Sequence, residues 1–481
     1  MAFHMIRYLA LAACAALLAS GCSDGDAPVS DRERRIGAEQ HPQLLAQFGG
    51  SYPGEEADYL RRLGEKLAKA AGLEGQCQFT LVNSDVVNAF AVPGCYIYVT
   101  RGLMGIVNSE AELASVLAHE VGHIAANHSE QQQRRSLLRG LGVAAIGAIT
   151  ESERLTRIAG AAAGLFTLRY SRKHEYEADD LGVTYLKTAG YDPYAAVDML
   201  GALGRHQKFL SATSGRDDAH SMPEWALTHP LTEGRVARST EAARASGLAP
   251  DALPDNRPEY LRELDGLLYG DDPAQGFVTG RRFAHPEMRI AFEAPPGFTL
   301  SNSPQAVRIE GPDGMQGEFS GGRLPPGGLA AYAEAVLAQL LGDAPVALGT
   351  AEQATVNGVR ALFLPATVQT QQGLVSLSVA AYQGSDGNAF HFVIVSPPGS
   401  APADAVHALY RSFRLLAPAE AASLRPRRIR TIQVGPADTL ASLASRMAGE
   451  QKMRHFLMLN GRSEQSPLRN GELVKIVVAG D

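Results

Sequence analysis

The chain has 481 residues, of which 45% are hydrophobic and 20% are charged, and this composition predicts a folded protein of two to four domains. The formal net charge of −7 is modest for this length. No concentrated basic stretch with interleaved aromatic residues is present, so nucleic acid is not expected as a partner. Beyond the N-terminal segment, no apolar run reaches the roughly 20 residues that span a bilayer.

Residues 1–21 have the pattern of a bacterial lipoprotein signal: a positive charge, an apolar core and small residues directly before Cys22. Cleavage there would leave Cys22 lipidated at the start of a short linker, residues 22–30, and several acyl chains give a lasting membrane anchor. Ser23, rather than an aspartate, follows the cysteine, and by resemblance to enterobacterial sorting rules this favours the outer membrane. The alternative is an ordinary secreted protein in which the cysteine is incidental.

The first folded domain is expected over residues 31–249 and is mainly helical. A helix over residues 55–71 and short strands near 78–83 and 95–100 belong to it. Two apolar runs between residues 141 and 166 predict a helical hairpin. Packing against the domain core and contact with lipid or a membrane partner are both open for this hairpin.

The sequence contains four cysteines, and Cys14 and Cys22 belong to the N-terminal signal. Cys77 and Cys95 therefore remain, both in predicted strands of a protein expected in an oxidising compartment, where disulfides persist. A bridge between them would contribute roughly 3 kcal/mol in the chain-entropy account. Two buried free thiols are an equally good interpretation.

A metal-binding pattern lies in the helix predicted over residues 109–127, at His119-Glu120-Val121-Gly122-His123. At about 100° per residue, the two histidines are roughly 40° apart on one side of the helix, a spacing that suits Zn²⁺. Chance alone would give HExxH in about a few per cent of chains of this length. However, Glu120 falls within the apolar stripe of the helix, where an unpaired carboxylate is costly. A zinc-bound water would give this carboxylate a partner.

A catalytic zinc ion usually has three protein ligands and one water, so a third ligand is needed. The best candidate is Glu175, at the start of a second predicted helix that continues through Leu186. Asp179 follows one turn later on the same apolar face and is expected to accept a hydrogen bond from a ligating imidazole. The alternative is an acidic, solvated helix start. Mn²⁺ and Co²⁺ are not excluded by such ligands.

A further histidine, His128, is not expected to be a ligand. The three-histidine pattern HExxHxxGxxH requires a glycine and a histidine at the positions where this chain has Ala126 and Ser129. On a continued helix, His128 would also point about 180° away from His119.

These motifs together resemble the zinc metallopeptidases related to the CaaX prenyl protease, and more closely their soluble bacterial envelope members of the BepA kind. The resemblance covers about the first 250 residues and departs from the family at Cys95, where a second glycine is common. It rests, in chain order, on Asn88-Ala-Phe90-Ala-Val-Pro93-Gly94 with the strand from Tyr96 to Gly102, on HExxH at 119–123, on Glu175 with Asp179, and on Thr228-His229-Pro230 with Arg235.

The resemblance implies a zincin-like domain in which Glu120 is the general base. It also implies that His229 lies near the metal, where it blocks the open position or steadies the transition state, with Arg235 as its support. Ordinary loop chemistry is the alternative for His229. A strand beside the active helix commonly pairs with extended substrate in HExxH peptidases, and we expect that edge at Tyr96, Ile97 and Tyr98, within 96–101.

In the second half of the chain, the sequence pattern changes from mainly helical to alternating strands. Residues 250–279 are expected to be a linker, and residues 280–418 an α+β domain with one antiparallel sheet and two flanking helices. The strands are separated by turns at Asp313-Gly314, Asn357-Gly358 and Asp386-Gly387. The outline vaguely resembles the PsbP-like fold. Substrate or partner binding is its expected role.

After a second linker, residues 419–430, the segment 431–478 resembles a LysM domain. Such a domain is a β-α-α-β unit that binds N-acetylglucosamine in peptidoglycan. Ala437 stands where the usual motif has glycine, so tethering to peptidoglycan and a role as a spacer remain equally open.

The sequence as a whole predicts a lipid-anchored periplasmic zinc endopeptidase whose substrates are misfolded, misassembled or stalled envelope proteins. Two alternatives remain. One is a zinc hydrolase of peptide crosslinks in peptidoglycan, and the other is a chaperone or assembly factor whose zinc site is kept shut by His229.

Overall fold

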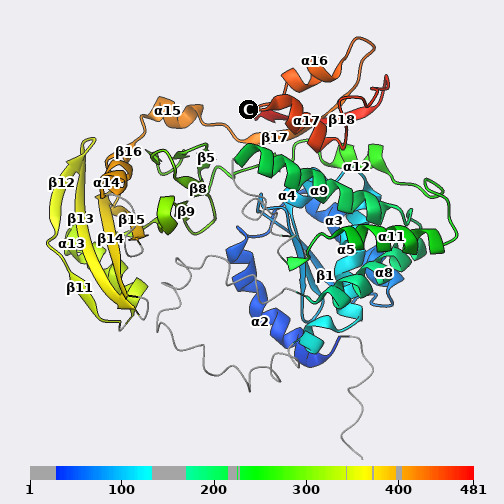
Figure 1. Cartoon of the computed structure of the whole chain (residues 1–481), viewed down its shortest axis with the longest axis horizontal. Coiled ribbons are helices and arrows are strands. Elements are labelled where there is room, and N and C mark those ends of the chain that lie inside the picture. The colour runs from blue at the N-terminus through cyan, green and yellow to red at the C-terminus, as the bar shows by residue number, and fades with distance from the viewer. Residues whose placement is uncertain are drawn as a thin grey trace, which may run out of the picture.

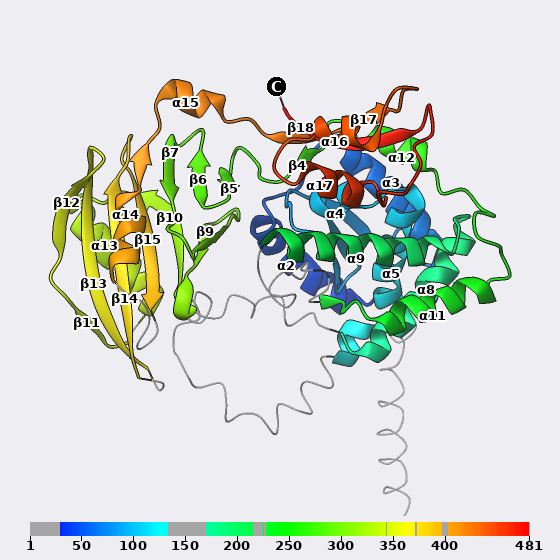
Figure 2. The same cartoon turned by 45° about the horizontal axis from the view of Figure 1, so that its top comes forward.

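The computed structural model describes residues 29–132, 170–214, 225, 228–342, 344–370, 373–396 and 403–480. The predicted signal, Cys22 and the predicted hairpin between residues 141 and 166 lie outside these ranges. The chain forms a helical lobe (29–270 with 427–480) and a sheet lobe (277–416), which lie side by side in Figures 1 and 2. The prediction of several domains with helices and antiparallel sheets is confirmed at this level.

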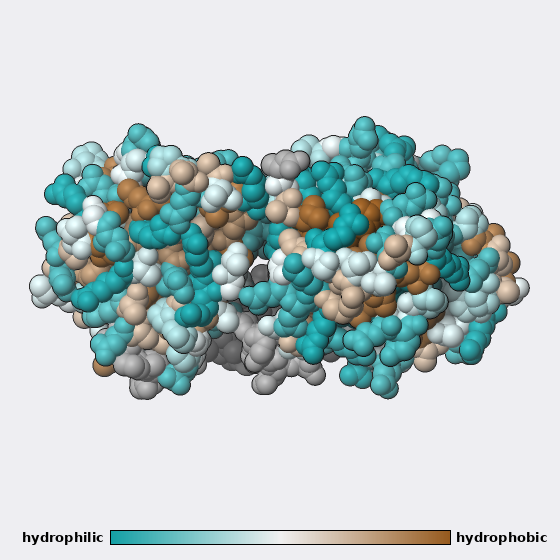
Figure 3. All heavy atoms as spheres, turned by 90° about the horizontal axis from the view of Figure 1, so that it is seen from above, coloured by the Kyte–Doolittle hydropathy of each residue, from teal (hydrophilic) through white to brown (hydrophobic). Residues whose placement is uncertain are grey.

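Within the ranges that the structure describes, no helix is both long enough and apolar enough to cross a bilayer. The spheres of Figure 3 show hydrophilic residues over most of one face of both lobes, with smaller hydrophobic areas between them.

Amphipathic helices surround a small sheet in the helical lobe. In α3, Leu60, Leu63 and Leu67 follow the helical repeat and are buried in the core. The helices of this lobe include α2 (Asp31–Gln47), α3 (Glu55–Ala70), α4 (Arg101–Ile106), α5 (Glu110–Ala125), α8 (Arg172–Thr188), α9 (Ala195–Ser214), α11 (Glu233–Ala245) and α12 (Arg257–Glu263).

Helix α5 lies at the centre of the lobe and is buried from Ala111 to Ile124. Its first turn is capped by Ser109, whose side chain accepts a hydrogen bond from the Glu112 backbone. Helix α8 approaches it closely at two glycines. A Cβ on Gly122 would lie 3.1 Å from the Ala178 carbonyl oxygen, and one on Gly182 would lie 3.4 Å from the backbone nitrogen of His119. This close crossing brings the start of α8 next to the histidines of α5.

The sheet beside α5 has the strand order β1–β3–β2. Strand β3 (Tyr96–Thr100) pairs in parallel with β1 (Gln78–Val82) and antiparallel with β2 (Ala89–Val92). The prediction that Tyr96, Ile97 and Tyr98 form an edge strand is therefore wrong, because β3 has a hydrogen-bonded neighbour on each side. The strand with an outer edge that packs against α5 is β2.

A disulfide joins Cys77 and Cys95, 18 residues apart in the sequence. The alternative of two free thiols is therefore wrong. Cys95 follows Gly94 in the turn between β2 and β3 and has φ 60°, in the left-handed region that favours glycine. This backbone conformation explains why a glycine suits the position, and the disulfide explains why a side chain is present.

The C-terminal module has the predicted β-α-α-β order, and Figure 1 shows it above the helical lobe. Its strands pair antiparallel with each other, and β17 also pairs with β4 (Leu268–Tyr269). Buried residues of the module, among them Ile429, Phe456 and Val477, belong to the same hydrophobic core as α3 and α5. The elements of the module are β17 (Arg427–Gln433), α16 (Leu440–Ser445), α17 (Lys452–Leu459) and β18 (Leu473–Ala479).

The segment 250–279, predicted to be a linker, differs from the prediction because it contributes to this core. Tyr260, Leu261 and Leu264 are fully buried, and the Tyr260 hydroxyl donates a hydrogen bond of 2.6 Å to the Met104 carbonyl. The second predicted linker, 419–430, likewise contains ordered elements, since α15 (Pro418–Ser423) lies at its start and β17 begins within it. Apolar packing between distant segments is therefore what fixes these stretches.

Lys475 ties the module to the helices around α5. It is fully buried in β18, and its ammonium group donates to the Gly105 carbonyl at 2.8 Å and the Val107 carbonyl at 2.7 Å, where α4 ends. Burial lowers the pKa of Lys475 well below its usual value, while the nearby carboxylate of Glu112 acts in the opposite direction. The Lys475 side chain thus reaches from the C-terminal module to the end of α4 and lies near the first turn of α5.

The sheet lobe contains an eight-stranded antiparallel sheet and a separate four-stranded sheet. The combination of antiparallel sheet and helices agrees with the predicted α+β domain, whereas the prediction of a single sheet is wrong. Side chains of β14 alternate between two cores: Val379 and Ala381 pack with α13 (Gly328–Leu341), whereas Ala380 and Tyr382 pack with α14 (Ala403–Arg411). The strands are β5 (Phe277–Thr279), β6 (Arg282–His285), β7 (Ile290–Glu293), β8 (Thr299–Ser301), β9 (Val307–Glu310), β10 (Gln316–Arg323), β11 (Val346–Leu348), β12 (Glu352–Val356), β13 (Val359–Thr370), β14 (Gly373–Gln383), β15 (Asn388–Ser396) and β16 (Arg414–Leu415).

The predicted turns of the sheet lobe are confirmed. Asn357 and Gly358 both have positive φ and join the paired residues Val356 and Val359, which is a two-residue primed hairpin turn. Asp313-Gly314 and Asp386-Gly387 also have positive φ at both positions.

Candidate metal centre

Three segments of the helical lobe bring four potential metal ligands together. They are His119 and His123 from α5, Glu175 from the first turn of α8, and His229, which lies just before α11. One donor atom from each side chain lies within 4.8 Å of all the others, and all four side chains are buried. The structure thus brings together the two histidines and the glutamate that the sequence predicted as ligands, and it adds His229.

The distances among these donor atoms fit a tetrahedral zinc ion. With bonds of roughly 2.0–2.2 Å, tetrahedral ligands are about 3.3 Å apart. The His119 Nε2 atom lies 3.1 Å from His123 Nε2 and 3.3 Å from His229 Nδ1. Glu175 Oε1 lies 3.6 Å from His123 Nε2 and 3.0 Å from His229 Nδ1. Three imidazoles and a carboxylate that converge in a buried position are a donor set that suits Zn²⁺.

Asp179 and Arg235 hold this group from behind. Asp179 Oδ1 lies 3.0 Å from the Nδ1 atom of His119, the ring nitrogen that faces away from the other donors. Arg235 donates to both carboxylate oxygens of Asp179, at 2.8 and 2.6 Å, and lies 3.1 Å from Glu175 Oε2. Asp179 therefore has the position predicted for an acceptor of an imidazole N–H.

These contacts oppose the effect of burial on the titrating groups. Burial alone would raise the pKa of Glu175, but the neighbouring His229 and His119 hold it well below its usual value. Burial would lower the pKa of His119, but its hydrogen bonds with Asp179 and Glu175 raise it to about 9. For His123, burial and the adjacent His119 lower the pKa well below its usual value.

His229 is held in place by the ring of Trp225 and by Arg235. The Trp225 and His229 rings stack with centroids 5.2 Å apart, and Arg235 donates to the His229 carbonyl at 3.3 Å. While Nδ1 of His229 faces the other donors, its Nε2 lies 3.7 Å from Glu120 Oε1. The predicted support of His229 by Arg235 is therefore present as a direct contact.

Glu120 projects beside the donor group and is fully buried. Within the described part of the chain, neither of its carboxylate oxygens has a hydrogen-bond partner. A buried carboxylate in this state is costly unless a cation or a bound water lies next to it. The glutamate of the HExxH motif thus lies where it can act on a molecule bound at the donor group.

Sequence reasoning missed two residues that contact His123. The Tyr170 ring stacks on the His123 ring with centroids 4.0 Å apart, and the His128 Nδ1 atom lies 2.9 Å from His123 Nδ1. The predicted direction of His128 is wrong because α5 ends at Ala125 and Asn127 has φ 52°, so that the chain folds back. His128 does not belong to the donor group, as predicted. The sequence signal for this reversal was Asn127, an asparagine shortly after the end of a helix.

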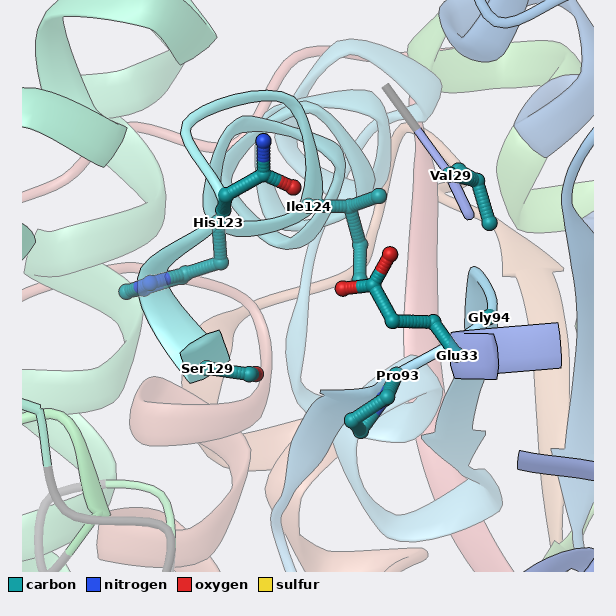
Figure 4. A pocket seen from close by; sticks show the side chains of 8 residues that line it. Val29, Glu33, Pro93, Gly94, His123, Ile124 and Ser129 are labelled. Atoms are coloured by element: carbon teal, nitrogen blue, oxygen red, sulfur yellow. The ribbon is translucent and has the colours of Figure 1, made fainter. Parts of the chain in front are cut away.

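Two hollows lie near these elements. A small one, of about 10 Å³, is enough for about one water molecule. Figure 4 shows its lining, with Glu33 of α2, the turn at Pro93 and Gly94, and Ile124 and Ser129 around it; His123 also lines it. A larger hollow, of about 640 Å³, lies between α9, β4, the sheet lobe and the C-terminal module, and none of the four donors lines it.

Comparisons with known proteins agree with this geometry. Residues 55–243, which contain all four donors, match peptidase family M48. The "Beta-barrel assembly-enhancing protease" of Yersinia pestis is 31% identical over 263 residues, which are 52% of each chain. The "Mitochondrial metalloendopeptidase OMA1" of Arabidopsis thaliana is 35% identical over 140 residues, 29% of this chain and 28% of the relative. The chain spans about half the length of the first of these relatives.

A solution structure of cyanobacterial PsbP from Synechocystis sp. PCC 6803 covers 30% of this chain and 98% of its own, with 15% identity and a TM-score of 0.23. This likeness is too weak to support an argument. By contrast, the predicted resemblance to zinc metallopeptidases of the BepA kind is confirmed for residues 55–243. The donor group lies in this matched segment and is of a kind that can hold the zinc ion of such enzymes.

Proposed function

We propose that this chain is a zinc-dependent endopeptidase of the M48 kind, with His119, His123 and Glu175 as zinc ligands and Glu120 as the general base. The observation that carries the proposal is the convergence of four buried donors at near-tetrahedral distances, beside a buried carboxylate with no hydrogen-bond partner among the described residues. A zinc ion held there would polarise a peptide carbonyl and activate a water molecule.

In this proposal, the protein side chains do the following. Glu120 accepts a proton from the attacking water and later passes it to the leaving amine. Asp179 keeps the His119 ring in its ligating orientation, because its carboxylate lies 3.0 Å from the far ring nitrogen and would accept the proton that this nitrogen carries when His119 binds zinc. Arg235 balances the charge of Asp179 and Glu175, with its nearest contacts at 2.6 and 3.1 Å.

His229 acts as a gate in this proposal. A zinc ion with four protein ligands has no open position, whereas a catalytic zinc needs one. His229 therefore has to leave the donor group before a peptide carbonyl can approach. It is suited to this because it lies between α9 and α11 rather than within a long helix, unlike His119, His123 and Glu175.

Substrate would bind along the outer edge of β2, in place of the edge first predicted on β3. The Asn88 carbonyl accepts from the Thr100 backbone toward β3, so strand alternation turns the backbone groups of Ala89 and Ala91 outward. An extended peptide could add to these groups as a further antiparallel strand. In the structure, the Trp225 backbone already donates to the outward carbonyl of Val87, so the segment leading to His229 begins on this same edge.

An edge strand recognises extended backbone, which folded proteins rarely expose, and this favours unfolded or misassembled proteins as substrates. The name of the Yersinia relative, a beta-barrel assembly-enhancing protease, agrees with an envelope substrate. The lipoprotein-like N-terminus, ending at Cys22, supports anchoring in the periplasm, with the outer membrane favoured by Ser23. Quality control of envelope proteins is the role we propose.

The remaining parts of the chain have accessory roles in this proposal. The β-α-α-β order of β17, α16, α17 and β18 supports the interpretation of residues 431–478 as a LysM-like module, which could contact peptidoglycan. We propose a PsbP-like outline for the sheet lobe. This lobe would bind substrates or partners.

The experiment compares the purified chain with Glu120→Gln and, as control, Glu241→Gln, an exposed acid on α11. We expect the wild type to hold one zinc ion and to cleave unfolded casein, and a chelator to abolish this cleavage. Glu120→Gln should reduce cleavage by about 10²–10⁴-fold while retaining zinc, because it removes a proton acceptor and no ligand. Glu241→Gln should cleave like the wild type.

Other outcomes would support the alternatives. Wild-type protein without zinc, or cleavage that persists after chelation, would contradict the proposal. Preferential release of soluble muropeptides from purified sacculi would favour hydrolysis of peptidoglycan crosslinks. A cellular phenotype that survives Glu120→Gln would favour a chaperone or assembly factor.

A further inference from the structure

We propose that His128 positions His123 for metal binding, by accepting a hydrogen bond from its Nδ1–H group. This inference rests on the proposed zinc site and adds a residue to it. It assigns a function to a histidine that is fully buried and lies outside the donor group.

The geometry around His123 determines which of its ring nitrogens carries the proton. Its Nε2 atom faces the donor group, at 3.1 Å from His119 Nε2 and 3.6 Å from Glu175 Oε1. Its Nδ1 atom lies on the other side of the ring, 2.9 Å from His128 Nδ1. A neutral imidazole has one N–H, and a nitrogen that binds a metal carries none. The proton of a ligating His123 is therefore on Nδ1, and His128 Nδ1 is the acceptor.

The surroundings of His128 are consistent with this assignment. If its Nδ1 accepts, its own proton is on Nε2, and this atom lies 3.5 Å from the Glu177 carboxylate. The ring is fixed on its face by His174, which stacks on it with centroids 4.4 Å apart and planes 15° from parallel. The left-handed backbone of Asn127, just before it, turns the chain back toward α5.

The two histidines of the HExxH motif would thus each have a separate acceptor. His119 uses the carboxylate of Asp179, at 3.0 Å, and His123 uses the imidazole of His128, at 2.9 Å. Acceptors of this kind fix the ring orientation of a ligating histidine, and their loss typically weakens metal affinity by about 10–100-fold. We expect His128 to contribute an effect within this range.

The experiment uses two amide substitutions that differ in where they place an acceptor. In His128→Asn, the side-chain oxygen can occupy the position of Nδ1 and accept from His123, whereas in His128→Gln the longer side chain carries its amide to the position of Nε2, away from His123. The zinc dissociation constant of the full chain is measured by competition with a chelator of known affinity. His174→Phe is the control, because it keeps an aromatic ring against His128 and leaves the His128 acceptor in place.

We expect His128→Asn and His174→Phe to bind zinc within about threefold of the wild type, and His128→Gln to bind it about 10–100-fold more weakly. Equal affinities for the Asn and Gln variants would overturn the inference, since general packing loss would not distinguish them. Melting temperatures of the zinc-free proteins provide the second measurement, and a positioning role predicts similar values for both variants. Failure of the wild type to bind zinc would instead contradict the proposed function.

Discussion

The two lobes differ in what they bury. Among the residues that the structure describes, all the buried aspartate, glutamate, arginine and lysine side chains lie in the helical lobe: Arg101, Glu112, Glu120, Glu175, Asp179, Asp192, Arg235 and Lys475. Among the described residues of the sheet lobe, the buried side chains that can carry a positive charge are His285 and His391. Because burying charge is costly unless it is paired or used, this difference indicates where the chemistry of the molecule lies.

The lobes also differ in how the chain builds them. The sheet lobe is one continuous stretch with aromatic cores, in which Phe292, Phe319 and Phe392 contact one another. The helical lobe is assembled from two stretches separated by the whole sheet lobe, and Lys475 near the C-terminus bonds to the carbonyls before α5. The last fifty or so residues are therefore part of the helical lobe, which holds the metal centre, and are not an independent tail.

The largest expected effect follows from this assembly. A chain that ends at residue 426 lacks β17 and β18 and leaves the core around α5 open to water, so we expect it not to fold its helical lobe or bind zinc. The matched change in the other lobe is Phe392→Ala, which should cost about 3–5 kcal/mol of unfolding free energy in the sheet lobe. It should leave zinc affinity unchanged.

Circular dichroism and zinc titration measure both proteins. If the shortened chain folds and binds zinc like the wild type, the C-terminal module is an independent domain after all. A loss of zinc affinity in Phe392→Ala would show that the two lobes are not separate in stability.

The same contrast explains what the sequence could predict. The HExxH spacing, the acidic face of α8 and the Asx-Gly turns are local patterns, and the structure has His119, His123 and Glu175 together and Asn357-Gly358 in a primed turn. The central position of β3 was not predictable in this way, since it depends on the parallel pairing with β1.

Other failures have similar causes. Residues 250–279 were expected to be a linker because of their composition, whereas Tyr260 and Leu264 become buried only through packing with distant helices. Strand β10 contains Gly317, Gly321 and Gly322, which weaken the strand pattern of its sequence. The fold-back of His128 depends on a single left-handed residue, Asn127.

The second prediction contrasts buried and exposed charge within one helix, α11. Arg235 is buried and binds Asp179 and Glu175, so Arg235→Met leaves two buried carboxylates without their partner and should cost about 3–5 kcal/mol. Arg238 pairs with Asp180 at the surface, and Arg238→Met should cost less than about 1 kcal/mol. Urea unfolding of the zinc-free proteins measures both. Similar costs would mean that the Asp179–Arg235 contact is not important for stability.

The smallest effect concerns the disulfide, which lies in the helical lobe and has no counterpart in the cysteine-free sheet lobe. Replacing both Cys77 and Cys95 by alanine should lower the free energy of unfolding by roughly 3 kcal/mol, because the unfolded chain loses a closed loop. Cys95 has φ 60°, which an alanine adopts only at a cost of about 1 kcal/mol, whereas glycine adopts it freely.

The variant that combines Cys77→Ala with Cys95→Gly should therefore be about 1 kcal/mol more stable than the double alanine variant, although both lack the bridge. Urea unfolding under oxidising conditions gives the comparison, and the wild type with reductant should resemble the double alanine variant. Equal stability of the two double variants would mean that the turn between β2 and β3 relaxes once the bridge is absent. In that case, the left-handed conformation at this position is imposed by the disulfide and not by the hairpin.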